Sequence, residues 1–180
     1  DLERVGRSVV AIEAARESDP EGEGGAGPLA AHRDYFNRPR GPASGVVYEP
    51  DGFIVTSAFN VSGVLRKDSL KVTLSDGREF TAELRGSDPG LDIALLKIDA
   101  KDLPVLPKAD PASLRQGAFV AVIGRSPDKR DCTVNSGILS ARNRMDGTAV
   151  QTDAAMNYGN AGGALVTRKG ELIGVGCHVK

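Results

Sequence analysis

The chain has 180 residues, 23 basic and 24 acidic side chains, and a formal net charge of −1. This length allows one compact domain or two small halves that share an interface. The balanced charge argues against a nucleic-acid backbone or an anionic membrane as partner. No apolar run approaches the ~20 residues that a membrane helix needs. With only two His and two Cys, an ordinary zinc site is not expected, and no metal or cofactor is predicted.

Many short elements joined by turns are indicated by 22 Gly and 10 Pro. Aromatic residues make up only 4% of the chain and Trp is absent, so the core must consist mainly of Val, Leu, Ile and Ala. This composition favours an all-β chain over a helical bundle. No signal peptide is visible, but the chain opens at Asp1 rather than Met, so this absence carries no information.

The N-terminal part predicts one strand followed by a long loop. Residues 7–13 (RSVVAIE) have the pattern of a strand. Residues 17–43 hold few large apolar side chains and are rich in Gly, Pro and charge, which predicts a mobile loop. Tyr35 and Phe36 within it either dock onto another subunit or cover the base of their own loop.

Regular strand patterns begin at Ser44. Residues 44–58 predict two strands joined by a turn at 49–52, because Pro-Asp-Gly favours a turn. A hairpin turn is predicted at 75–78, between two strands in which apolar and polar residues alternate. The nearly unbroken apolar run at 92–98 predicts a strand that is buried on both faces.

A second set of strands follows the polar, Pro-rich connection at 99–117. Its members are predicted at 119–123, 134–141, 149–152, 164–167 and 172–176. About eleven short strands in two groups, with no helix longer than two turns, predict two packed antiparallel barrels.

Three segments resemble the HtrA/Do branch of the trypsin-like serine proteases. Residues 51–61 (DGFIVTSAFNV) match the family pattern D-G-[YF]-I-[VL]-T-N-x-H-V-V, in which His is the general base. Residues 87–98 (SDPGLDIALLKI) match the segment that supplies the family's Asp. Residues 151–175 match the segment Q-T-D-A-A-I-N-P-G-N-S-G-G-A-L-V, in which Ser is the nucleophile. The resemblance covers residues 5–15 and 44–178.

Two of the three catalytic positions hold residues without the required chemistry. Asp92 stands at the family's Asp, but Phe59 stands where His is expected and Ala161 where Ser is expected. Acyl transfer of this class needs an oxygen nucleophile and an imidazole that takes its proton. The resemblance therefore implies a protease fold that does not cut peptides, with Asp92 as a remnant of the triad that could accept backbone N–H groups in a purely structural role. Ala161 alone could also be an engineered substitution, whereas Phe59 favours a natural pseudoprotease.

An oxyanion hole made of backbone amides does not require the serine hydroxyl. Gly159 and Ala161 are therefore expected to retain amides that aim at a carbonyl oxygen. Tyr158 replaces the family's Pro, and residues 125–131 (RSPDKRD) depart from the usual Asn-Pro-Phe-Gly.

The same resemblance implies a trypsin-like double β-barrel of two six-stranded antiparallel barrels. The expected division is 1–103, with the mobile loop 17–43, and 104–180. The family continues beyond the Gly-Glu-Leu-Ile-Gly-Val segment with one more strand, so either residues were removed after Lys180 or the second barrel is incomplete. No PDZ domain is expected. A homo-oligomer, trimeric by resemblance, and an extracytoplasmic location are implied.

The last predicted strand supplies candidates for a peptide cleft, because the equivalent strand lines the cleft in the family. The candidates are Gly174, Gly176, Cys177 and His178. A Cys177–His178 dyad is not expected, because neighbouring side chains of a strand point to opposite faces. Cys132 and Cys177 could form one disulfide or remain two buried thiols.

Three hypotheses about function follow. The favoured one is an inactive HtrA-like domain that holds an extended peptide beside residues 174–178 by strand addition, or serves as a subunit of an assembly. The second is a serine endopeptidase represented here by an inactivated copy. The third is a metal-binding or scaffolding use of the fold, which only His32 and His178 support.

Overall fold

A computed structural model of the chain describes residues 2–15, 43–62, 70–125, 131–157 and 159–177. Most of the loop predicted at 17–43, with Tyr35, Phe36 and His32, lies outside these residues, as do Tyr158 and His178. The described elements are eleven strands and three short helical segments, so the all-β prediction is confirmed. No helix among the described residues is long and apolar enough to cross a membrane.

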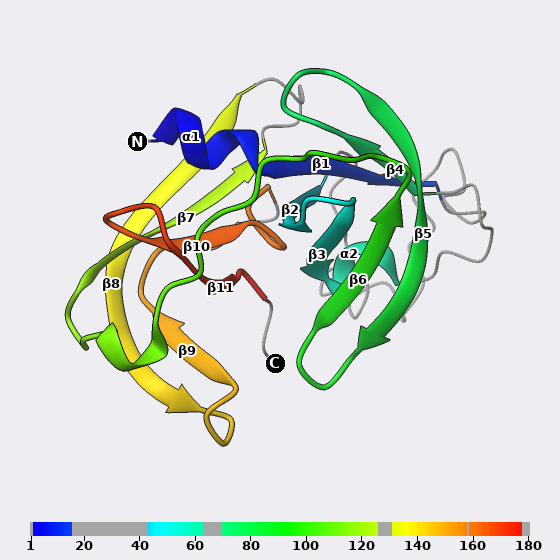
Figure 1. Cartoon of the computed structure of the whole chain (residues 1–180). Coiled ribbons are helices and arrows are strands. Elements are labelled where there is room, and N and C mark those ends of the chain that lie inside the picture. The colour runs from blue at the N-terminus through cyan, green and yellow to red at the C-terminus, as the bar shows by residue number, and fades with distance from the viewer. Residues whose placement is uncertain (1, 16–42, 63–69, 126–130, 158, 178–180) are drawn as a thin grey trace, which may run out of the picture.

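The first six strands form a closed barrel in the order β1-β2-β3-β6-β5-β4, at the right of Figure 1. Every pairing in it is antiparallel. The predicted turns between β2 and β3 and between β4 and β5 are confirmed by N–H to C=O bonds from Gly52 to Glu49 and from Gly77 to Leu74. The bounds are β1 Val9–Ala14, β2 Ala43–Glu49, β3 Phe53–Ser57, β4 Leu70–Thr73, β5 Glu79–Asp88 and β6 Ile93–Ile98.

The remaining strands form a second, curled sheet in the order β11-β10-β7-β8-β9 (Figure 1). Among the described residues this sheet has five strands and does not close, so the fold is a trypsin-like double barrel whose second barrel is incomplete. A 3₁₀ turn, η3 (Pro111–Ser113), lies in the connection between the two sheets. The bounds are β7 Phe119–Arg125, β8 Cys132–Arg144, β9 Ala149–Thr152, β10 Ala164–Thr167 and β11 Leu172–Val175.

Three apolar clusters form the core. One fills the closed barrel with the inward-facing side chains of its strands, for example Ile54 and Leu96. A second joins the two halves and includes Val5 and Val46 together with Ile123. The third lies within the second half, around Leu139. The joining cluster makes the two halves one packed unit.

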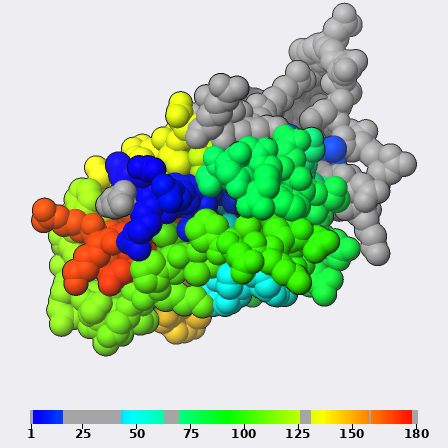
Figure 2. Space-filling model, turned by 45° about the horizontal axis from the view of Figure 1, so that its top comes forward, coloured from blue at the N-terminus to red at the C-terminus, as the bar shows by residue number. Residues whose placement is uncertain are grey.

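Two predictions about local structure were correct only in part. The strand expected at 7–13 begins only at Val9, because residues Leu2–Arg7 form a short helix, α1, that buries Val5 in the joining cluster. Figure 2 shows α1 in blue, packed between the second sheet in yellow and the first half in green. The strand at 92–98 is not buried on both faces: exposure alternates along β6, and only Ala94, Leu96 and Ile98 are fully buried.

Candidate active site

The helix α2 (Ala58–Val61) brings the position expected for the general base next to Asp92. Asp92 is 9% exposed and stands just before β6 with a positive φ of 53°. Its carboxylate accepts a bond from the Ser57 hydroxyl at 2.6 Å and another from the Phe59 backbone N–H at 2.8 Å. Asp92 therefore stabilises the start of α2 with its side chain, through a backbone N–H rather than through the side chain at position 59.

The turn between β9 and β10 carries Ala161 and is fixed by buried hydrogen bonds. The Ala161 carbonyl accepts from the Asn60 side-chain amide at 2.9 Å and from the Ser44 N–H at 3.3 Å. Gly162 follows with a φ of +82°, and a Cβ there would collide with the Ser44 carbonyl. Because α2 contacts Asp92 through Phe59 and the Ala161 turn through Asn60, the structure brings the three predicted catalytic positions together.

The Ala161 amide is not directed toward a vacant oxyanion position in this conformation. Its N–H donates to the Asn157 carbonyl at 3.0 Å, and the Asn160 N–H donates to the same oxygen at 3.2 Å. The Gly159 carbonyl accepts from the Ser44 hydroxyl at 2.5 Å. A carbonyl of the chain itself thus accepts the Ala161 N–H in this conformation. The oxyanion-hole role of Gly159 and Ala161 stays a prediction.

The strand β11 lies at the edge of the second sheet, where the cleft residues were predicted. Its first residue, Leu172, is covered on the outer side by the connecting segment: its N–H donates to Pro107 at 2.7 Å, and its carbonyl accepts from Ala109 at 2.8 Å. Gly176 uses both backbone groups within the chain, with Gly163 as acceptor and Gly162 as donor. Among the described residues, the part of the β11 edge that the connecting segment leaves uncovered therefore begins after Leu172.

Both cysteines are half-buried and neither forms a disulfide. Burial raises the pKa of the Cys177 thiol to about 11, and the negative charge of Asp92 contributes to the rise. Cys177 therefore lies near Asp92 but is protonated at neutral pH, which makes it a poor nucleophile. Burial also raises the pKa of Cys132, against the nearby positive charge of Arg125.

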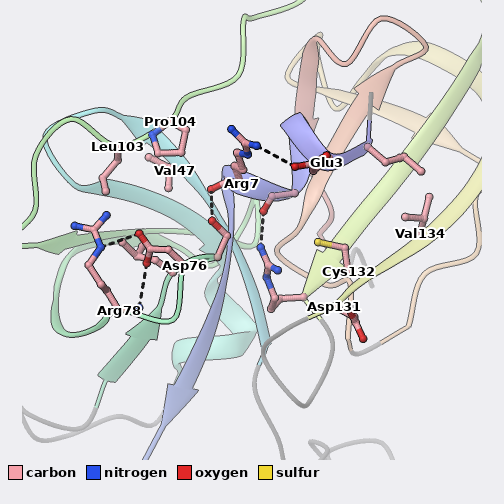
Figure 3. Close-up of a pocket in the computed structure, with 15 residues that line it drawn as sticks. Glu3, Arg7, Val47, Asp76, Arg78, Leu103, Pro104, Asp131, Cys132 and Val134 are labelled. Atoms are coloured by element: carbon pink, nitrogen blue, oxygen red, sulfur yellow. Dashed lines mark hydrogen bonds and ion pairs between the residues drawn. The ribbon is translucent and has the colours of Figure 1, made fainter.

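A separate cavity of about 650 Å³ opens beside α1, between the β4–β5 hairpin and the start of β8 (Figure 3). Four of its charged side chains form two ion pairs: Arg7 with Glu3 at 2.9 Å and Arg78 with Asp76 at 2.8 Å. None of the predicted catalytic residues lines it. Within the described ranges, no three His, Cys, Asp or Glu side chains are grouped to hold a metal ion.

The trypsin-like peptidase domain family matches residues 43–175. The chain is an HtrA-type trypsin-like protease domain. This HtrA-type domain is 44% identical over 140 residues to the periplasmic serine endoprotease DegP of Escherichia coli, covering 73% of the chain and 29% of DegP. It is 43% identical over 145 residues to a protein named as a probable DegP-like periplasmic serine endoprotease from Halomonas elongata, and the match covers 78% of the chain and 30% of that protein.

A solved structure titled "HtrA-type protease AlgW with tripeptide" superposes on this HtrA-type domain with a TM-score of 0.74 at 32% identity. The match covers 97% of the chain and 52% of that protein. The domain thus spans about 30% of the length of the two curated relatives and about half of AlgW.

Sequence reasoning found Asp92, Phe59 and Ala161 but missed the residues that hold them. Ser44, Ser57 and Asn60 are all buried and all hydrogen-bonded at the site. Only Asn60 left a sequence signal, as a polar residue inside the apolar segment Ala-Phe-Asn-Val. The serines look like ordinary strand residues.

Proposed function

We propose that this HtrA-type domain does not hydrolyse peptides and instead binds an extended peptide or protein segment. The presence of Phe59 and Ala161 at the positions matched to the general base and the nucleophile carries this proposal. Without an imidazole and a hydroxyl, the attack that opens the peptide bond lacks both its nucleophile and its proton acceptor. The internal bonds of Asp92 to α2 support a structural role for that carboxylate.

The proposed binding surface is the edge of β11 after Leu172, with the cleft residues Gly174, Gly176 and Cys177; His178, predicted with them, lies outside the described residues. An extended segment that adds to a sheet edge gains main-chain hydrogen bonds, and side-chain pockets then set its specificity. A Cβ built on Gly174 meets no described atom within 4 Å. Gly176 is enclosed by Met156 and Asn160, so we assign it a packing role beside the bound strand.

A homo-oligomer is proposed as the assembled form. Four large apolar side chains of α1, β7 and β8 are exposed: Leu2, Phe119, Val134 and Ile138. Phe119 and Ile138 are direct cross-strand partners, which places two exposed apolar residues side by side. We further propose an extracytoplasmic location, supported by the periplasmic names of the curated relatives.

The second candidate function is that of an active serine endopeptidase represented here by an inactivated copy. It is favoured by the names of the relatives, which describe endoproteases. The coding sequence distinguishes the two candidates: a natural Ala codon at position 161 excludes the second one.

Fluorescein-labelled, unfolded casein tests the proposal as both ligand and substrate. We expect binding without cleavage, and no labelling by a fluorophosphonate. The Gly174→Phe substitution should weaken binding at least about tenfold, equivalent to about 1.4 kcal/mol, because the ring would occupy the edge. Gly86→Phe in β5 is the matched control, since a Cβ there also meets no described atom within 4 Å. Cleavage that survives repurification, or equal binding by both variants, would contradict the proposal.

A further inference from the structure

The side chain of Asn60 crosses from the first barrel to the Ala161 turn. It is 8% exposed, and its amide nitrogen lies 3.0 Å from the Thr56 hydroxyl, 2.9 Å from the Ala161 carbonyl and 3.4 Å from the Ser44 carbonyl. A buried amide whose acceptors lie on different segments fixes the distance between those segments. Asn60 thus ties α2 to the turn with a direct hydrogen bond.

This hydrogen bond depends on an Asn where the family pattern has an apolar residue. In that pattern the catalytic His is followed by Val, whereas here Phe59 is followed by Asn60. A Val side chain has no donor and could not bond to the Ala161 carbonyl. The tie between α2 and the turn therefore accompanies the replacement of the expected base.

The far side of the turn is closed by two asparagines that bond to each other. The Asn157 N–H donates to the Asn160 side-chain oxygen at 2.7 Å, and the Asn160 N–H donates to the Asn157 side-chain oxygen at 3.1 Å. This reciprocal pair points the Asn157 carbonyl at the N–H of Ala161. The Ala161 residue is consequently held at its N–H by Asn157 and at its carbonyl by Asn60.

We propose that Asn60 is a positioning residue that keeps the Ala161 turn in this internally bonded conformation, so that a peptide along β11 is bound without a hydrogen bond from the Ala161 amide. The inference concerning the peptide rests on the proposed function; the internal bond does not. The peptide group that carries the Ala161 N–H is fixed on both sides: Asn60 anchors the Ala161 carbonyl after it, and its own carbonyl, that of Asn160, accepts from the Gly163 N–H at 2.9 Å. This N–H therefore cannot turn away from Asn157 unless the Gly163 N–H loses its acceptor.

Hydrogen exchange of single amides, measured by NMR on the whole chain without peptide, tests the internal bond. We expect the Ala161 amide to be protected, and Asn60→Val to reduce its protection about tenfold relative to the Leu96 amide in the barrel core. Dividing the protection of the Ala161 amide by that of the Leu96 amide corrects for any loss of stability that affects the whole domain. Asn135→Val is the matched control, because the Asn135 amide donates to Ala155 in the same loop without contacting Ala161.

Three results would overturn the proposal. One is exchange of the Ala161 amide at the unprotected rate in the unsubstituted protein, a measurement that does not depend on any variant folding. Another is an unchanged ratio in Asn60→Val. Addition of saturating casein peptide gives a third comparison: protection of Ala161 should persist, and its loss on binding would contradict the inference. If no peptide binds, the proposed function fails while the internal bond is still decided by the first two results.

Discussion

Removal of the Ser44 hydroxyl, a single oxygen atom, is expected to lower the free energy of unfolding of the domain strongly. Ser44 is fully buried, and its hydroxyl group accepts a hydrogen bond from the Arg125 backbone N–H at 2.7 Å and donates one to the Gly159 carbonyl at 2.5 Å. Ser44→Ala leaves both groups without this partner. An unsatisfied buried polar group costs about 1–3 kcal/mol. The Arg125 bond is fully buried, whereas the Gly159 bond is partly buried, so water compensates part of the second cost.

The combined loss is about 2–4 kcal/mol for the free energy of unfolding. For a domain of this length, each kcal/mol lowers Tm by roughly 2–4 °C, so the expected decrease in Tm is about 5–15 °C. Urea denaturation followed by circular dichroism measures the free energy, and an unchanged m-value shows that the unfolded state is the same. The control is Ser113→Ala, whose hydroxyl donates to Asp110 at an exposed turn and which should stay within about 0.5 kcal/mol. Equal midpoints for the two variants would refute the reasoning.

Three other outcomes are expected. The double substitution Phe59→His plus Ala161→Ser should remain at least roughly three orders of magnitude below an active relative in burst kinetics with an activated ester, and activity within tenfold would show that two side chains alone separate the domain from a protease. The pKa of the Cys177 thiol is about 11 in the folded protein, above the ordinary 9.0. Because the unfolded chain loses this proton first, the free energy of unfolding should decrease as pH rises from about 9 to about 11. The Cys177→Ala substitution should make that decrease smaller. Ile138→Asp should shift the mass measured by light scattering to that of a monomer if the exposed face of β8 is the contact between copies, and an unchanged mass would exclude that face.

The sequence predicted the parts of the fold that depend on local patterns. Alternating apolar residues marked β4 at Leu70 and Val72, both now buried, and Pro50-Asp51-Gly52 marked the first turn. A continuous apolar run could not show that one face of β6 is only half-buried, because that depends on what the other strands leave uncovered. The helix α1 was missed because its packing relies on partners more than a hundred residues away, such as Arg125.

The candidate site likewise has a part that the sequence predicted and a part that it could not. Phe59, Asp92 and Ala161 were found because each occupies a position within a recognisable motif. The bond from the Ala161 amide to Asn157 was not predictable, because it depends on the orientation of one peptide group rather than on residue type. Asn60 could have been noticed as a polar residue in an apolar segment, but its acceptor at Ala161 lies 101 positions further along the chain.

The packing of α1 has a consequence for how the chain folds. Arg125 is 3% exposed and donates to the carbonyls of Gly6 and Val9, at separations of 119 and 116 positions. Residues of α1 and β1 therefore acquire these partners only after β7 has been synthesised. Since contacts of such high sequence separation slow folding, we expect the joining cluster to form late. A fragment ending at residue 103 would expose the apolar side chains of Val5 and Val9, so the two halves should be poor candidates for separate expression.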